Sequence, residues 1–365
     1  MLNPLHVDPD LIIRSRDPFN AEPGLVRLRA AFRTAQADFY VRSHGDIPAL
    51  DAASYRLRVA GRVTTPMVLS LDALRERFPI RTVSAVMQCA GNRRADLNAV
   101  RPVTGDPWAP GAIGNADWTG VALADVLRAA GVAEQDPSLH VAFSAGDEIE
   151  MDGEGRFTYG VSIPIGKALS PEVLLAFEMN GEPLMPQHGF PLRAVVPGFA
   201  GVRSAKWLTD VIVQDRPSDN HMQRRDYKML PADMTRETVD WERGIMIYDM
   251  PLNAAICEPA PFADLEAGFV TLRGYAIATA RKIVRVEVSV NGGGTWMQAA
   301  LEPRADAPWS WTFWEVGCTL PKGEHELVVR AWDSAGQAQP ARPEDIWNFK
   351  GYLSAAWHRV PIRAH

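Results

Sequence analysis

A cysteine followed closely by two arginines is the feature of this sequence most able to do chemistry. Cys89 ends an apolar, β-branched run that begins at residue 82, and Arg93 and Arg94 follow it within five positions. The run predicts a strand that enters a hydrophobic core. A thiolate is a nucleophile and a soft metal ligand, and nearby guanidinium groups favour its ionised form. A buried structural cysteine is the alternative interpretation. The arginine pair favours an anionic ligand, such as a phosphate, an oxyanion or a metal–oxo group.

Two other stretches carry cations in a similar setting. FYVRSHG holds Arg42 and His44, and on local evidence it is either a solvated loop or a second contact to an anion. Further along, single basic residues alternate with glycine and large apolar residues, which fits closure on one polyanionic ligand better than a solvated basic face. These basic residues are His188, Arg193, Arg203 and Lys206. Tyr227 follows two arginines and an aspartate, and an isolated tyrosine there is a core or rim residue by default.

The elements that must position these residues follow from local patterns. Residues 1–36 show little periodicity and are predicted to form an extended arm over the surface of a domain. Residues 54–63 alternate as a strand, and Ser70 is predicted to cap a short helix that ends at Pro79. Residues 121–131 predict an amphipathic helix closed by Gly131, and Asn180-Gly181 marks a tight turn after a strand.

The composition changes near residue 250, which predicts two domains. From there the chain consists of short alternating strands separated by Gly, Asn and Asp turns, the pattern of an all-β sandwich. We therefore predict one domain over residues 1–250 and a second over residues 251–365. The chain of 365 residues is long enough for both to bury their own cores.

Charge and motif content exclude several classes of function. The net charge of −6 provides no basic footprint for nucleic acid or an anionic membrane, and there is no apolar run of membrane-spanning length. The three cysteines lack the spacing of a disulfide framework or a zinc site, and no glycine-rich nucleotide motif is present. The first residues show no basic patch followed by an apolar segment, so we expect a cytoplasmic protein, or a periplasmic one if a leader was removed.

Several strings in their order along the chain resemble one known family. CAGNRR after an apolar strand, FYVRSHG before it, EMNGEP, HGFPLR and KWL after it, then RRDYKM and the terminal WNFKG and WHRV together resemble the sulfite oxidase family. The likeness extends from about residue 16 to the C-terminal WHRV. It implies an α+β fold, in which a mixed α/β molybdopterin domain precedes an all-β immunoglobulin-like dimerisation domain. The implied cofactor is molybdenum-molybdopterin, with Cys89 as the only protein ligand of the metal.

The resemblance also assigns site residues by motif position. The substrate pocket of the family is lined by cations, a Trp and a Tyr hydroxyl, which implies catalytic roles for Arg42, Arg94, Trp108, Tyr227 and Lys350. The residues implied to bind the cofactor are Tyr40, Arg42, His44, Cys89, Asp147, His188, Arg193, Ser204, Ala205 and Lys206.

This chain departs from the family pattern at several positions. Lys350 stands where the family has an arginine, so the positive charge is kept but the planar guanidinium group, which can form two parallel hydrogen bonds, is lost. Thr104 takes the place of a basic residue that is often found before the pocket tryptophan, and the loop around Asp147 is shorter than usual. We expect no haem domain before the molybdenum domain, so electrons are expected to pass to an external acceptor such as oxygen or a cytochrome.

The activity that the resemblance implies is molybdenum-dependent oxidation of sulfite to sulfate by a haem-free homodimer. Nitrate reduction and reduction of S- or N-oxides are alternatives on the same cofactor scaffold. Arg94, Tyr227 and a cationic Lys350 favour sulfite over nitrate, and the C-terminal sandwich argues against the S-oxide reductase type. A binding protein without cofactor is a further alternative, disfavoured because a costly cluster of like charges needs a ligand.

Overall fold

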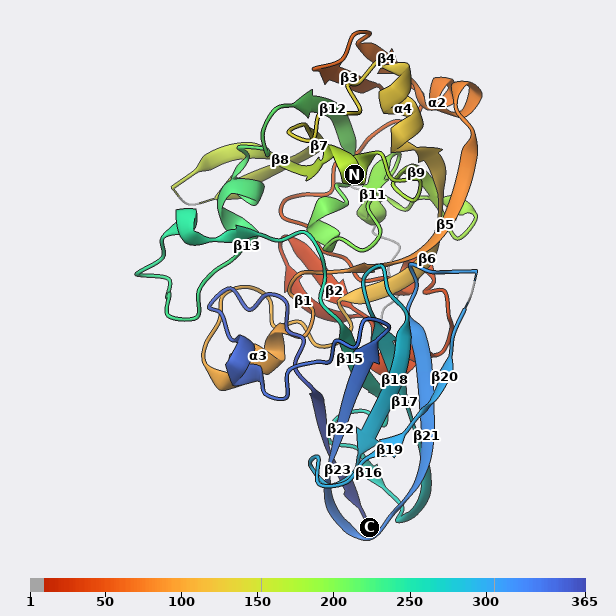
Figure 1. The fold of residues 1–365 in the computed structure, drawn as a ribbon, viewed down its shortest axis with the longest axis vertical. Coiled ribbons are helices and arrows are strands. Elements are labelled where there is room, and N and C mark those ends of the chain that lie inside the picture. The colour runs from red at the N-terminus through yellow and green to blue at the C-terminus, as the bar shows by residue number, and fades with distance from the viewer. Residues whose placement is uncertain (1–9, 152, 305) are drawn as a thin grey trace.

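The fold consists of a mixed α+β region followed by a β-sandwich, as the resemblance implied (Figure 1). The computed structural model describes residues 10–151, 153–304 and 306–365. The α-helices are α1 (Leu25–Arg29), α2 (Leu71–Arg77), α3 (Arg94–Val100), α4 (Leu123–Ala129) and α5 (Ile165–Ala168). The single-turn helical segments are η1 (Gln36–Asp38), η2 (Pro186–His188), η3 (Gly201–Arg203), η4 (Met222–Asp226), η5 (Trp241–Arg243) and η6 (Pro343–Ile346).

Strands dominate both regions of the chain. Those of the first region are β1 (Ile12–Arg16), β2 (Phe19–Glu22), β3 (Leu57–Gly61), β4 (Met67–Leu69), β5 (Ile80–Gln88), β6 (Ile113–Ala122), β7 (His140–Met151), β8 (Gly155–Pro164), β9 (Leu174–Met179), β10 (Glu182–Pro183), β11 (Arg193–Val195), β12 (Leu208–Gln214), β13 (Lys228–Met229) and β14 (Ile245–Met246). Those of the second are β15 (Asn253–Glu258), β16 (Asp264–Leu265), β17 (Gly268–Ile277), β18 (Ile283–Ser289), β19 (Met297–Gln298), β20 (Ala300–Glu302), β21 (Thr312–Leu320), β22 (Gly323–Asp333) and β23 (His358–Ala364).

Two sheets build the first region. One has the strand order β10-β9-β6-β5, with β11 also paired to β9, and the other has the order β4-β3-β12-β7-β8. Strands β5 and β6 pair antiparallel over the whole length of β5, from Ile80 opposite Val121 to Gln88 opposite Ile113. This long ladder fixes the end of β5 in space, and therefore fixes the position of the residue that follows it.

Local sequence signals account for several of these elements. The Ser70 hydroxyl accepts a hydrogen bond from the Ala73 amide, and so caps α2 as predicted. Asn180 and Gly181 both adopt a positive φ, of 57° and 81°, which is the conformation that a two-residue hairpin turn requires. Gly131, with a φ of 74°, follows the last turn of α4. These local predictions are confirmed.

The described part of the predicted N-terminal arm, residues 10–36, is more deeply embedded than predicted, and residues 1–9 of that prediction lie outside the described residues. Strands β1 and β2 form an antiparallel hairpin, and Asn20 and Glu22 are only 2% and 0% exposed. The prediction of an arm lying over the surface is therefore wrong for β2. Sequence periodicity missed the burial because these side chains are polar and are buried through hydrogen bonds, which leave no apolar pattern in the sequence.

The second region is a sandwich of two sheets. Their strand orders are β15-β17-β21-β20 and β16-β23-β22-β18-β19, and the core between them includes fully buried Trp314. "Immunoglobulin-like" is thus only a loose description of this domain. Residues 347–353 leave the sandwich and pack on the first region. Tyr352 joins the core of that region, and Trp347 belongs to the cluster around Leu97 in α3. The boundary between residues 250 and 251 stays a prediction.

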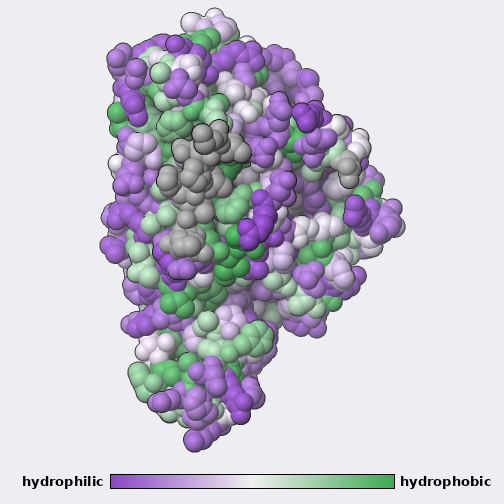
Figure 2. All heavy atoms as spheres, turned by 180° about the vertical axis from the view of Figure 1, so that it is seen from behind, coloured by the Kyte–Doolittle hydropathy of each residue, from purple (hydrophilic) through white to green (hydrophobic). Residues whose placement is uncertain are grey.

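The surface is of mixed polarity. The face in Figure 2 shows hydrophilic residues over most of its outline, with hydrophobic residues in patches between them. Within the described residues, no helix has both the length and the apolar character needed to cross a membrane.

Candidate active site

Cys89 lies directly after β5 and faces a cavity. Because side chains alternate along a strand, Met87 and Cys89 share one side of the chain, and both line this cavity. The Cys89 amide donates to the Ala112 carbonyl at 2.9 Å, and the Gly91 amide points at the Cys89 sulfur from 3.4 Å. Cys89 is 5% exposed, so its thiol is held in a buried and fixed position.

The environment of this thiol balances burial against positive charge. Burial raises the pKa of the Cys89 thiol above its usual value, while Arg94 and Arg42 oppose that rise. The arginines alone therefore do not make Cys89 a thiolate, contrary to the simplest expectation from sequence. A bound cation would remove the proton, since a coordinating thiol is deprotonated by its metal.

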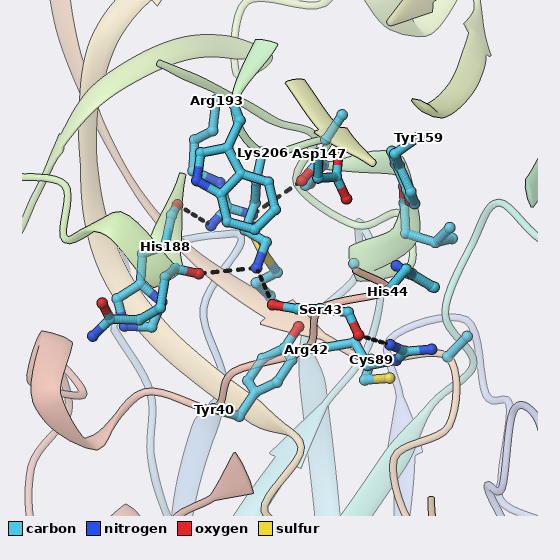
Figure 3. A pocket seen from close by; sticks show the side chains of 18 of the residues that line it. Tyr40, Arg42, Ser43, His44, Cys89, Asp147, Tyr159, His188, Arg193 and Lys206 are labelled. Atoms are coloured by element: carbon cyan, nitrogen blue, oxygen red, sulfur yellow. Dashed lines mark hydrogen bonds between the residues drawn. The ribbon is translucent and has the colours of Figure 1, made fainter. Parts of the chain in front are cut away.

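The cavity gathers the residues that were assigned to the cofactor. It encloses about 660 Å³, including the solvent at its mouth. Figure 3 shows side chains from widely separated segments converging on it. The lining residues that the sequence predicted are Tyr40, Arg42, His44, Cys89, Asp147, His188, Arg193, Ser204, Ala205, Lys206 and Tyr227. Every residue predicted to bind the cofactor is thus on the cavity wall, while its contact with the cofactor itself stays a prediction.

Arg42, His44 and Tyr227 lie together at one part of the cavity wall. His44 Nε2 lies 2.7 Å from the Tyr227 hydroxyl. Burial and the nearby Arg42 hold the pKa of His44 well below its usual value, so the ring is neutral at pH 7. The loop carrying His44 lies tightly against β7, because a Cβ at Gly45 would come within 1.9 Å of the Glu148 carbonyl oxygen.

A second group of basic side chains lies at another part of the wall (Figure 3). Arg193 donates to the carbonyls of His188, at 2.8 Å, and Ser204, at 3.0 Å. Lys206 Nζ donates to Ser43 Oγ at 3.2 Å and to the Gln187 carbonyl at 2.9 Å. Burial lowers the pKa of Arg193 to about 10 and that of Lys206 well below its usual value. Bringing these cations together in a buried cavity is unfavourable without an anionic partner.

Asp147 supplies a carboxylate beside these cations. It lies where the pairing of β7 with β8 shifts register between Ser144 and Glu148, and such bulges redirect side chains next to functional sites. Burial raises the pKa of Asp147 to about 6, although Lys206 acts in the opposite direction. Its Oδ1 atom is buried and has no hydrogen-bond partner among the described residues. This acceptor is available to an N–H group of a ligand.

The two arginines after Cys89 have different surroundings. Arg94 Nη1 donates to the Asp106 carbonyl at 2.9 Å and Nε to the Lys350 carbonyl at 3.1 Å. A Cβ at Gly91 would lie 2.5 Å from Arg94 Nη2, so the guanidinium group packs directly on the turn that follows Cys89. Arg93 instead donates to Asn253 Oδ1 and thereby ties this turn to the second region. Arg93 is therefore structural, whereas Arg94 lies against the turn that carries Cys89.

Three predicted catalytic residues are outside the described cavity wall. Arg94 is 6% exposed and acts on Cys89 through its charge. Trp108 is fully buried in the cluster that contains Tyr40. Lys350 is ion-paired with Asp226. Their contact with substrate stays a prediction.

Sequence reasoning missed nearly half of the wall. The residues it did not single out are Phe39, Ser43, Met87, Ala90, Tyr159, Gln187, Gly201, Val202 and Trp207. Ser43 and Gln187 stand beside predicted residues in the chain, and that proximity was the available signal. Tyr159 carried none, because it is one of many residues in an ordinary alternating strand, β8.

Comparison with known proteins decides the family. Residues 44–222 match the model of the oxidoreductase molybdopterin binding domain, and residues 244–365 match the Mo-co oxidoreductase dimerisation domain. Sulfite oxidase of Gallus gallus is 44% identical over 96% of this chain and 77% of its own length. This chain belongs to the sulfite oxidase family. Sulfite oxidase of Arabidopsis thaliana is 37% identical over 97% of this chain and 94% of its own length.

Other similar proteins differ in length or carry the name of another activity. The chain spans 66% of the mitochondrial sulfite oxidase of Mus musculus, to which it is 42% identical. A nitrate reductase of Hordeum vulgare is 36% identical over 96% of this chain and 41% of its own length. The solved sulfane dehydrogenase SoxCD of Paracoccus pantotrophus superposes with a TM-score of 0.79 at 25% identity, over 96% of this chain and 85% of that one. The α+β fold predicted from the sequence is confirmed.

The residues of the cavity fit a molybdenum-molybdopterin cofactor. Cys89 offers the soft thiolate, and Arg193 and Lys206 offer cations for a phosphate-bearing group. The unpartnered Asp147 oxygen suits the N–H groups of a pterin ring. No cluster of three or more His, Cys, Asp or Glu capable of holding a metal exists within the described residues.

Proposed function

We propose that this protein oxidises sulfite to sulfate and passes the electrons to an external acceptor. The observation that carries this proposal is the placement of the Cys89 thiol and the Arg42 guanidinium in one buried cavity (Figure 3). Sulfite is a small oxyanion, and a guanidinium group binds such anions through paired, charge-assisted hydrogen bonds. The similarity to sulfite oxidases over nearly the whole chain supports the same conclusion.

The protein residues bind and orient the anion in this reaction. When bound, the molybdenum cofactor supplies oxygen-atom transfer and accepts two electrons. Arg42 attracts sulfite, and its guanidinium group stays charged, because its pKa lies above an already high ordinary value even though burial acts to lower it. The Tyr227 hydroxyl lies 2.7 Å from His44 Nε2, so with Nε2 protonated it accepts a hydrogen bond from the neutral imidazole and donates its own proton in a hydrogen bond to an oxygen of the anion. Overall, sulfite and water yield sulfate, two protons and two electrons.

Turnover with a set of acceptors tests this proposal. Molybdenum-loaded protein is mixed with sulfite and either oxygen, ferricyanide or cytochrome c. Turnover with oxygen and formation of peroxide identifies an oxidase, whereas turnover only with ferricyanide or cytochrome c identifies a dehydrogenase. No turnover with any of the three, despite bound cofactor, contradicts the proposal and favours the nitrate or S-oxide alternatives.

We also propose that the protein is a homodimer formed through its C-terminal sandwich. The match of residues 244–365 to a dimerisation domain supports this assembly. Light scattering that gives twice the mass of the 40.2 kDa chain is the expected result. A monomer at micromolar concentration would contradict it. The identity of the acceptor and the cellular compartment stay predictions.

A further inference from the structure

Strand β2 lies between the loop that carries Arg42 and the loop before β6, whose Asp106 carbonyl binds Arg94. On one side, Ala21 and Val41 exchange backbone hydrogen bonds of 3.0 and 2.8 Å, so β2 pairs with the residue just before Arg42. On the other side, Glu22 accepts hydrogen bonds from the amides of Ala109, at 2.8 Å, and Gly111, at 3.0 Å. The hairpin is therefore bound to the Arg42 loop and to the loop that precedes β6.

Asn20 connects these loops through one side chain. Its Oδ1 accepts from the Ser43 amide at 2.7 Å, and its Nδ2 donates to Asp106 Oδ2 at 3.0 Å. A carboxamide can make both bonds at once because it carries an acceptor and a donor on the same plane. Asn20 is 2% exposed and its partner Ser43 is 1% exposed, whereas Asp106 is half-buried.

Both partners of Asn20 hold an arginine. The Ser43 carbonyl accepts from Arg42 Nη1, and the Asp106 carbonyl accepts from Arg94 Nη1 at 2.9 Å. The Asp106 carboxylate also lies close enough to help raise the pKa of Arg42, even though burial acts to lower it. One buried side chain thus bridges the two backbone segments that fix the two guanidinium groups.

We propose that Asn20 is a positioning residue for the substrate anion. Asn20 sets the spacing of Arg42 and Arg94 through its hydrogen bonds to Ser43 and Asp106. This inference rests on the proposed function, because the two arginines matter as a pair only when a small oxyanion bridges them. Bidentate recognition depends strongly on geometry, and a small displacement of one guanidinium group weakens it.

Substitution by aspartate separates this role from a general loss of packing. Asn20→Asp has the same shape and keeps the acceptor for the Ser43 amide, but it replaces the donor to Asp106 by a like charge. In the double variant Asn20→Asp/Asp106→Asn the donor is now on residue 106 and the acceptor on residue 20. The bridge and the local charge are both restored, while the Asp106 carbonyl that binds Arg94 is unchanged.

Two measurements on the cofactor-loaded protein test the proposal: the Michaelis constant for sulfite, and the affinity for sulfate by calorimetry in the absence of turnover. We expect Asn20→Asp to weaken both by about tenfold, the effect of one hydrogen bond to a charged group, with kcat changed by less than about threefold. The double variant should recover most of both losses. Failure of the double variant to recover either quantity would overturn the proposal.

Asn180→Asp is the matched control. Asn180 Oδ1 also accepts from a backbone amide, that of Asp117 at 3.0 Å, and its Nδ2 donates to the Thr34 carbonyl at 2.9 Å, but neither partner holds a substrate arginine. The Asn180→Asp variant should have a lower melting temperature and an unchanged affinity for sulfate. Equal weakening of sulfate binding in both single variants would show a purely structural effect and overturn the proposal.

Wild-type protein that binds sulfate but does not oxidise sulfite would refute the proposed function while leaving the test of Asn20 intact. Wild-type protein that binds no sulfate would refute the positioning role itself.

Discussion

The Lys350 ammonium group is ion-paired with the carboxylate of Asp226, the residue that directly precedes Tyr227. The side chains of Lys350 and Asp226 are only 14% and 13% exposed. Burial acts to raise the pKa of Asp226, but Lys350 outweighs it and the pKa lies below its usual value. Lysine at this position therefore does more than replace a family arginine, because it anchors the segment that presents the Tyr227 hydroxyl.

Removing the Lys350 charge should be costly for stability. We expect Lys350→Met to lower the free energy of unfolding by about 3–5 kcal/mol, since it leaves a buried carboxylate without a partner. Urea denaturation at pH 7 measures this loss. Adding Asp226→Asn to Lys350→Met should recover most of it, because the uncompensated charge is then gone. A loss below about 1 kcal/mol would mean that the pair is effectively solvated.

Arginine at position 350 tests whether this side chain also contacts the anion. Lys350→Arg can keep a bond to Asp226 and present further N–H groups toward the cavity. We expect a lower Michaelis constant for sulfite with stability nearly unchanged, measured by steady-state kinetics. An unchanged Michaelis constant would show that residue 350 acts only through Asp226.

Cys89→Ser should abolish turnover while leaving the fold intact. A hydroxyl is a poor substitute for the soft thiolate as a metal ligand. Substituting a residue that only contacts a metal ligand typically lowers activity by about 10- to 100-fold, and loss of the ligand itself should lower it further. We expect sulfite turnover to fall by more than about a hundredfold with an unchanged circular dichroism spectrum. Cys318→Ser, at a buried cysteine of the sandwich strand β21, is the control and should keep its activity. Full activity of Cys89→Ser would refute the assignment of Cys89 as the metal ligand.

Tyr227→Phe should act mainly on kcat. It removes the hydroxyl that lies 2.7 Å from His44 Nε2, and general acid–base groups contribute about 10²- to 10⁴-fold. We therefore expect kcat to fall at least about a hundredfold, with a smaller change in the Michaelis constant. Tyr55→Phe is the control, since the Tyr55 hydroxyl donates to the Leu208 carbonyl at 2.5 Å and plays no part in the cavity. An equal loss in both variants would argue against a role for the Tyr227 hydroxyl in the reaction.

Buried histidines should make the protein less stable in mild acid. Burial lowers the pKa of His358 from 6.5 to about 3, and its Nδ1 accepts a hydrogen bond from the Ile256 amide at 3.1 Å. Below pH 6.5 the unfolded state binds a proton that the folded state excludes, so stability falls as the pH falls from 6.5 toward 3. Between pH 7 and pH 5 this single group should remove about 2 kcal/mol from the free energy of unfolding.

His358→Asn isolates this contribution, because its Oδ1 can still accept from the Ile256 amide but does not titrate. Urea denaturation of both proteins at pH 7 and pH 5 should show a loss smaller by about 2 kcal/mol in the variant. Equal losses would mean that His358 is protonated in the folded state.

Local signals in the sequence accounted for individual elements and for the residue types of the site. The helix cap at Ser70, the turn at Asn180 and the strand that ends before Cys89 all depend on neighbours within a few positions, so each could be predicted. The order of the motifs, through the resemblance, selected the predicted cofactor residues, and the structure shows that all of them line one cavity.

Contacts between distant residues could not be predicted in the same way. Local patterns presented Arg93 and Arg94 as a pair of cations, and only the resemblance assigned Arg94 alone to the pocket. In the structure the backbone at Arg93 has a φ of 63°, and this turn sends the Arg93 side chain to Asn253 and the Arg94 side chain to the Asp106 carbonyl. Local patterns likewise presented residues 1–36 as a surface arm, because a polar side chain buried by hydrogen bonds has no signature in hydrophobic periodicity.

The sequence by itself determined which chemical groups are present and the local elements that carry them: a thiol at the end of a strand, single cations in loops and an all-β C-terminal part. Only the tertiary structure decided which groups act together. Asp226 meets Lys350 across 124 positions of chain, and Asn20 meets Asp106 across 86. Such pairings arise from the packing of whole elements, whereas local conformational preferences act only over a few neighbouring residues.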